Sequence, residues 1–174
     1  MVTVSNHAKE KIESVKEKLG SAFQTEDDLG VVIRAHIVLE SLVDEFIFSK
    51  TVCNKSLSRM KMTFEQKVLL AIALGFDSRF EKPLKAIATI RNRFAHNLRG
   101  NIDKSDTNNF YKAFSNVDKT IMQRQFFNGS EQVESLLEKE PTKTKFGIYV
   151  MSLTIAITSF NLAQENTESS GIIA

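Results

Sequence analysis

The sequence of 174 residues is 42% hydrophobic and 25% charged, which is the composition of one folded domain and excludes disordered and fibrous classes. Its net charge of +2 gives no overall field that would favour a nucleic-acid or membrane partner. Two prolines and seven glycines are too few for the turns of an all-β chain, so we expect an all-α fold.

A single cysteine, Cys53, permits neither an internal disulfide nor a thiolate metal site. The first residues lack the charged leader and apolar stretch of a secretion signal. His7, His36 and His96 show no paired ligand spacing, so we expect no metal and no other cofactor. Together these features predict a cytoplasmic protein.

The first expected helix covers residues 6–23, where apolar residues recur at helical spacing and charged residues face water. A second helix is expected over residues 31–48, after Thr25 and Asp28, which approximate a capping box. Its wide apolar surface predicts a central helix with contacts on more than one side. The main stripe is Val32, Ala35, Leu39, Leu42, Val43 and Phe46, and the additional positions are Ile33, Ile37 and Ile47.

A polar stretch at residues 54–58 separates this helix from the next. Thr63 and Gln66 have the spacing of a capping box, and residues 64–74 have the pattern of a short helix that ends at Gly75.

The following helix is expected over about residues 83–98, with Pro83 in its opening turn, where proline is tolerated. Ser105 or Asp106 is a candidate cap for a polar helix that reaches about residue 114.

Residues 128–130, Asn-Gly-Ser, predict a loop, and the acidic residues 131–140 predict a solvated helix that ends at Pro141. The sequence assigns no role to the segment 119–140.

The longest uncharged run, residues 146–163, contains several polar residues and is shorter than the roughly 20 apolar residues that cross a bilayer. It therefore predicts a buried helix and no membrane partner. Residues 166–174 are expected to fray. No repeat or linker divides the chain, so we expect one domain over residues 1–174 with a core of about residues 6–165.

The most informative stretch is residues 90–97, Ile-Arg-Asn-Arg-Phe-Ala-His-Asn. At about 100° per residue, Arg91 projects from near the middle of an apolar arc. An unpaired buried cation is costly, so Arg91 must meet a carboxylate, a phosphate, carbonyl groups or water. The arc consists of Leu84, Ile87, Ala88, Phe94, Ala95 and Leu98.

Glu40 is the preferred internal partner for Arg91, because it lies at the rim of the second helix's stripe. His36 precedes it by four residues, so the two side chains can meet and face the Arg91 helix. In one interpretation Arg91 and Glu40 form a structural pair that fixes helix register, and His96 is an ordinary surface histidine. Periodicity alone favours this structural interpretation.

In the other interpretation, Arg91 and His96 act on a ligand together. Asn92 and His96, four residues apart, are neighbours on the polar flank of the helix. Arg91 and His96 are about 140° apart around the axis and about 7.5 Å apart along it. Joint action therefore requires the long arginine side chain or a second protomer.

Arg91, Asn92 and His96 resemble the signature of the higher-eukaryote and prokaryote nucleotide-binding (HEPN) domains: an arginine, a polar residue, and a histidine near the end of a bundle helix. Two sequence segments also resemble HEPN-related bacterial proteins grouped with the mannitol operon repressor. They are residues 64–75, Phe-Glu-Gln-Lys-Val-Leu-Leu-Ala-Ile-Ala-Leu-Gly, and residues 90–96, Ile-Arg-Asn-Arg-Phe-Ala-His. The resemblance spans roughly residues 28–99.

This resemblance implies an up-and-down helical bundle, here of about five to six helices, that dimerises so that arginine and histidine of both protomers share one cleft. It further implies a metal-independent endoribonuclease of a toxin or defence type. His96 would move the proton of the RNA 2′-OH, Arg91 would hold the phosphate, and Asn92 would orient either group. A protein regulator or antitoxin is a further expected partner.

Leu98 stands where one toxin branch of the family, regulated by a partner nucleotidyltransferase, has tyrosine, which makes that branch a poorer fit. Relatives of the mannitol repressor act in regulation, and some lack the histidine. A non-catalytic regulatory or interaction module is therefore the alternative function.

Local charge is compatible with RNA. Between residues 84 and 124 there are eight Lys or Arg residues against three Asp, and Arg93 and Arg99 are candidate supporting residues within this stretch. Aromatic residues in the same region favour the core over base stacking: Phe110, Tyr111, Phe126 and Phe127. Glycine-rich phosphate loops are absent, and the helix after Gly75 is too apolar for a helix-turn-helix reader of DNA.

Overall fold

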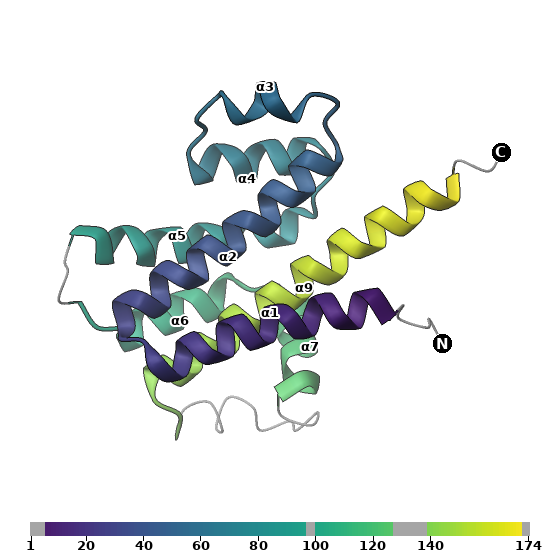
Figure 1. The fold of residues 1–174 in the computed structure, drawn as a ribbon. Helices are drawn as coiled ribbons and strands as arrows, with labels where there is room; N and C mark the ends of the chain where they lie inside the picture. The colour runs from purple at the N-terminus through teal and green to yellow at the C-terminus, as the bar shows by residue number, and fades with distance from the viewer. Residues whose placement is uncertain (1–5, 97–99, 127–138, 172–174) are drawn as a thin grey trace.

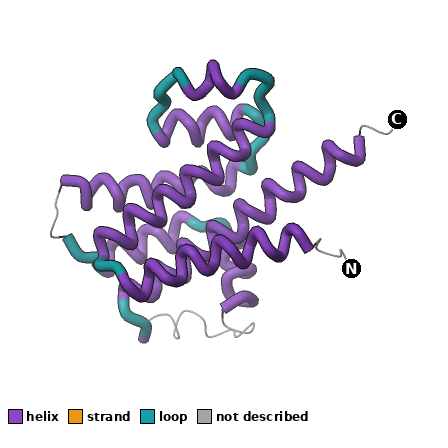
Figure 2. The backbone as a smooth tube through the Cα atoms, in the orientation of Figure 1, coloured by secondary structure: helices purple, strands orange, loops and turns teal. Residues whose placement is uncertain are grey.

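The structure is a computed structural model that describes residues 6–96, 100–126 and 139–171. Within these ranges the chain forms helices joined by loops and turns, with no β-strand (Figure 2). The predicted all-α fold is confirmed.

Two long helices begin the chain: α1 (Asn6–Thr25) and α2 (Asp28–Ser49). The expected cap formed by Thr25 and Asp28 is wrong, because Asp27 accepts a 2.8 Å hydrogen bond from the backbone N–H of Gly30. Thr25 belongs to α1, and its hydroxyl donates to the Ser21 carbonyl. The Asp28 carboxylate instead accepts from the backbone N–H of Ile102, at 2.9 Å, and so links the start of α2 to the segment before α6.

The polar stretch after α2 forms a short helix, α3 (Asn54–Ser58), in which no residue is buried. Next comes α4 (Phe64–Ala73), and here the predicted capping box is confirmed. The Thr63 hydroxyl accepts from the Gln66 backbone, and the Gln66 side chain accepts from the Thr63 backbone. The helix ends as expected at Gly75, whose φ of +101° is a conformation that favours glycine.

A 3₁₀ turn, η1 (Ser78–Phe80), leads into α5 (Glu81–His96), which has Pro83 in its first turn. The next helices are α6 (Lys104–Ala113) and α7 (Asn116–Phe126). Ser105 is not the cap of α6. Asp103 is, in a reciprocal capping box with Asp106, because it is the last residue with extended backbone before the helix.

The last helix, α9 (Thr142–Gly171), contains the expected buried run and extends well beyond it. The prediction of a frayed tail from residue 166 is wrong as far as Gly171. No proline interrupts this segment, and the turn that precedes it is held by contacts to neighbouring helices: Lys50 donates to Gln164 at 3.3 Å, and the ammonium of Lys11 lies 4.0 Å from the Glu165 carboxylate. The loop predicted at 128–130 and most of the helix predicted at 131–140 fall outside the described residues.

Part of α9 is long and apolar enough to cross a bilayer by length and composition alone. Because 61% of its most apolar window is buried inside the protein, it is consistent with the core helix of a soluble protein.

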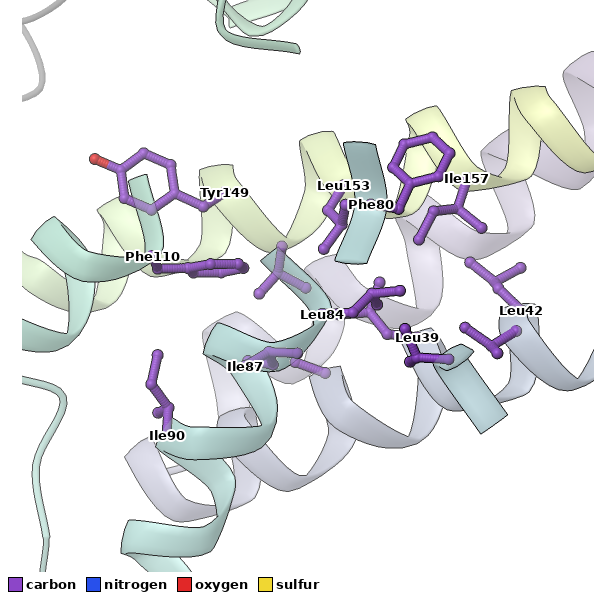
Figure 3. Close-up of a cluster of buried hydrophobic side chains, with 14 of the residues drawn as sticks. Leu39, Leu42, Phe80, Leu84, Ile87, Ile90, Phe110, Tyr149, Leu153 and Ile157 are labelled. Carbon is purple, nitrogen blue, oxygen red and sulfur yellow. The ribbon is translucent and has the colours of Figure 1, made fainter. Parts of the chain in front are cut away.

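The helices form a bundle in which α9 packs against α1, α2, α6 and α7, while α2 also packs against α1, α4 and α5 (Figure 1). Side chains from these helices meet in one continuous core (Figure 3). The predicted stripe of α2 is fully buried, and Phe110 is a core residue in contact with Phe114, Phe146 and Tyr149. At one side of this core, α2, α4 and α5 enclose the cleft described next.

Candidate functional site

A cleft of about 650 Å³ that carries charged groups lies between α2, α4 and α5. It brings together His36, Glu40, Arg91 and Asn92, which were all named as site residues from the sequence. Its lining comprises His36 and Glu40 of α2, Met62 and Thr63 before α4, Phe64, Glu65 and Val68 of α4, and Lys85, Ala88, Thr89, Arg91 and Asn92 of α5.

Arg91 is half-buried at the edge of the packed face of α5, not at its centre. The predicted apolar arc was misplaced because it counted Ala88, which is half-buried, and Ala95, which is exposed; Ile90 belongs to the core instead. The Arg91 Nη1 donates a 2.9 Å hydrogen bond to the Oδ1 of Asn92. The guanidinium therefore lies in an accessible polar cleft.

Glu40 does not pair with Arg91. Its Oε1 accepts a 2.8 Å hydrogen bond from Lys67, which also binds Asp44 at 2.8 Å. Lys67 of α4 projects toward α2 between the two carboxylates, so one ammonium satisfies both of them. The expected contact of Glu40 with His36 is present, with 3.6 Å between Oε2 and Nδ1.

His36 is 4% exposed, and its ring centroid lies 4.5 Å from that of Phe64. Burial lowers the pKa of His36, and the nearby Arg91 charge lowers it further; Glu40 opposes this shift, and Lys67 adds to it. The imidazole is consequently neutral at pH 7. It forms part of the wall of the cleft.

The two cations that line the cleft are satisfied in different ways. Lys85 binds Glu81 at 2.9 Å and Glu65 at 3.7 Å, and the hydrogen bond to Glu81 is the main cause that raises the Lys85 pKa. Arg91 makes no ion pair within the described part of the chain and bonds only to the neutral Asn92 amide. Its charge is therefore available to an anion that enters the cleft.

His96 is exposed at the last residue of α5 and does not line the cleft. Its side chain makes no hydrogen bond or ion pair to another described residue. The structure thus brings Arg91 and Asn92 together and leaves His96 at the end of the same helix, open to solvent.

Arg93 supports the fold. It binds the Asp106 carboxylate, donates to the Asn101 carbonyl at 3.1 Å, and places its guanidinium carbon 4.8 Å from the ring centroid of Phe94. It therefore ties α5 to the start of α6. The other supporting candidate, Arg99, lies outside the described residues.

Sequence reasoning missed Lys67, Asp44 and Phe64 as neighbours of this site. The capping box fixed where α4 begins, but nothing in the spacing of residues indicated which face of α4 would lie against α2. For Phe64 alone the sequence offers a local signal, because Phe64 directly follows the cap Thr63, which also lines the cleft.

Among the described residues, no group of three or more His, Cys, Asp or Glu side chains is arranged to hold a metal ion. No family model matches this chain, and no curated protein or solved structure shows significant similarity to it.

Proposed function

We propose that this protein is a HEPN-like, metal-independent endoribonuclease of the cytoplasm that acts as a homodimer. The observation that carries the proposal is the state of Arg91: a half-buried guanidinium in a 650 Å³ cleft, bonded to Asn92 and not to a carboxylate. An ion pair with Glu40 was the main structural explanation for a cation at position 91, but Glu40 pairs with Lys67 instead. An anionic ligand such as a phosphodiester fits the remaining charge.

In the proposed reaction the RNA 2′-oxygen attacks the adjacent phosphorus, which forms the P–O2′ bond and breaks the P–O5′ bond. His96 accepts the 2′-OH proton, and solvent water donates a proton to the departing 5′-oxygen. Arg91 offsets the negative charge that grows on the phosphoryl oxygens. Asn92 holds the Arg91 guanidinium in position through their hydrogen bond.

The test is cleavage of labelled single-stranded RNA in excess chelator. We expect fragments that end in cyclic phosphate, with activity reduced at least about 100-fold by Arg91→Ala and by His96→Ala, in line with loss of a charge-stabilising or proton-transferring group. Lys82→Ala removes an exposed cation from the same helix outside the cleft and serves as the matched control. Equal activity in all three variants would point to a contaminating nuclease.

The second candidate function is a non-catalytic regulatory or interaction module, and the separation of His96 from the cleft favours it. If the folded protein cleaves none of a varied set of RNAs, and a protein regulator is still bound through the α5 surface, this function replaces the first.

A further inference from the structure

The connection between α2 and α4 carries charged residues of one sign only. From residue 46 to residue 64 there is no Asp or Glu, whereas Lys50, Lys55, Arg59 and Lys61 give four positive charges. A solvated loop of mixed composition would be expected to carry both signs. We call residues 50–61 the basic segment.

The basic segment is exposed and held in place at both ends. It begins at the C-cap of α2 and ends just before the Thr63–Gln66 capping box, while α3 within it buries no residue. Lys55, Arg59 and Lys61 are exposed and make no ion pair within the described ranges. In Figure 1 this segment stands at the margin of the bundle, beyond α4.

The basic segment adjoins the cleft that holds Arg91. A smaller hollow of about 250 Å³ is lined by Lys61, Ser58 and Phe48 among others, and it shares Met62 with the cleft. The carboxylates where the two hollows meet, Glu40 and Asp44, are both bound by Lys67. A negatively charged strand that leaves Arg91 in this direction passes two carboxylates whose combined charge is half offset by Lys67, and then reaches the exposed cations Lys61 and Arg59.

We infer that the basic segment binds the phosphates of the RNA strand that flanks the nucleotide held at Arg91. This inference rests on the proposed function, which supplies RNA as the ligand. An anionic membrane is the poorer fit, because the segment lacks the aromatic side chains that insert at a bilayer surface and exposes only two large apolar ones, Val52 and Met60. Evenly spread cations with few apolar neighbours suit a sugar-phosphate backbone.

The experiment measures the affinity of the full chain for a fluorescent 2′-O-methyl oligoribonucleotide of about 12 residues, which binds but cannot be cleaved. The test variant is K55Q/R59Q, and the charge-matched control is K9Q/K82Q, which removes two exposed cations from α1 and α5. We expect about tenfold weaker binding at low salt for the test variant only. Because each phosphate contact to a single strand contributes about 0.7 to the slope of log K against log salt, the slope should become shallower by about 1.4.

Thermal unfolding establishes first that both double variants are folded. Equal affinity of the test and control variants overturns the inference; if Arg91→Ala still weakens binding, the proposed function survives that result. If K55Q/R59Q loses RNA binding while Arg91→Ala binds normally, the result supports RNA binding by the basic segment and contradicts the proposed site at Arg91. Absence of RNA binding by the unmodified protein overturns both the inference and the proposed function. Binding to vesicles that contain phosphatidylserine, if it depends on Lys55, would show that the basic segment binds a membrane instead.

Discussion

Arg91 and Arg93 lie two residues apart on α5, yet their surroundings give them different roles. Arg91 bonds to the exposed Asn92 amide, whereas Arg93 binds Asp106, a carboxylate that is only 9% exposed. We expect Arg91→Ala to lower the free energy of unfolding by less than about 1 kcal/mol, because an exposed hydrogen bond adds little to stability. Urea denaturation measures this difference.

Arg93→Ala should be more destabilising, by about 2 kcal/mol, because it leaves the Asp106 carboxylate largely buried without its cation. The same urea titration provides the comparison. A larger loss for Arg91→Ala than for Arg93→Ala would return Arg91 to a structural role and remove the main support for an anion site.

His36 makes the stability of the fold depend on pH. Its pKa in the folded protein lies below the unfolded value of 6.5, so the unfolded chain binds more protons as the pH falls through this value. The free energy of unfolding should therefore decrease from pH 7 toward pH 5. In His36→Gln this decrease should be smaller, and parallel curves for the two proteins would show that His36 does not contribute.

Much of the residue-level picture could be read from the sequence. The spacing of His36 and Glu40 predicted their contact, and the position of both beside the Arg91 helix is confirmed. The direction of Arg91 could not be predicted, because alanines do not indicate which side of a helix is buried. Whether Glu40 pairs with Arg91 or with Lys67 depends on how α2 and α4 pack against each other, and the local spacing of residues does not determine that packing.

At the scale of the element, α4 depends on its cap. Thr63→Ala removes the side-chain acceptor for the Gln66 backbone N–H and should cost about 1 kcal/mol of stability, whereas Thr63→Ser keeps the oxygen and should cost much less. Differential scanning calorimetry of the two variants provides the measurement. Similar melting temperatures for Ala and Ser would contradict a stabilising role for this cap.

The helices that follow strong local rules were predicted well, since α4 begins directly after its cap Thr63 and ends before Gly75 as expected. The elements that were missed depend on weaker or non-local effects. α3 buries nothing, so it has no apolar period to find. The extension of α9 is accompanied by contacts of Lys11 and Lys50 with its later turns, and these residues are more than a hundred positions away in the chain.

At the scale of the whole molecule, the proposed dimer makes a prediction about mixed protomers. Arg91→Ala and His96→Ala chains, each inactive alone, should form heterodimers that retain one Arg91 and one His96 for a shared cleft. Mixing them after brief denaturation and refolding should restore a measurable part of the cleavage activity. Sedimentation analysis should show a dimer in every sample, and a monomer that cleaves RNA would contradict the shared site.

The two ends of the bundle differ in what they present to solvent. Near one end the beginning of α1 and the late turns of α9 lie together, with Lys11 4.0 Å from Glu165, while the His96 end of α5 lies at the opposite side (Figure 1). A dye or affinity handle attached to the exposed Lys9 near the start of α1 would thus lie on the side of the bundle opposite that end of α5. Molecules immobilised through Lys9 should accordingly present the last turns of α5, which include Arg91, to solution, which suits single-molecule recordings of nucleic-acid capture.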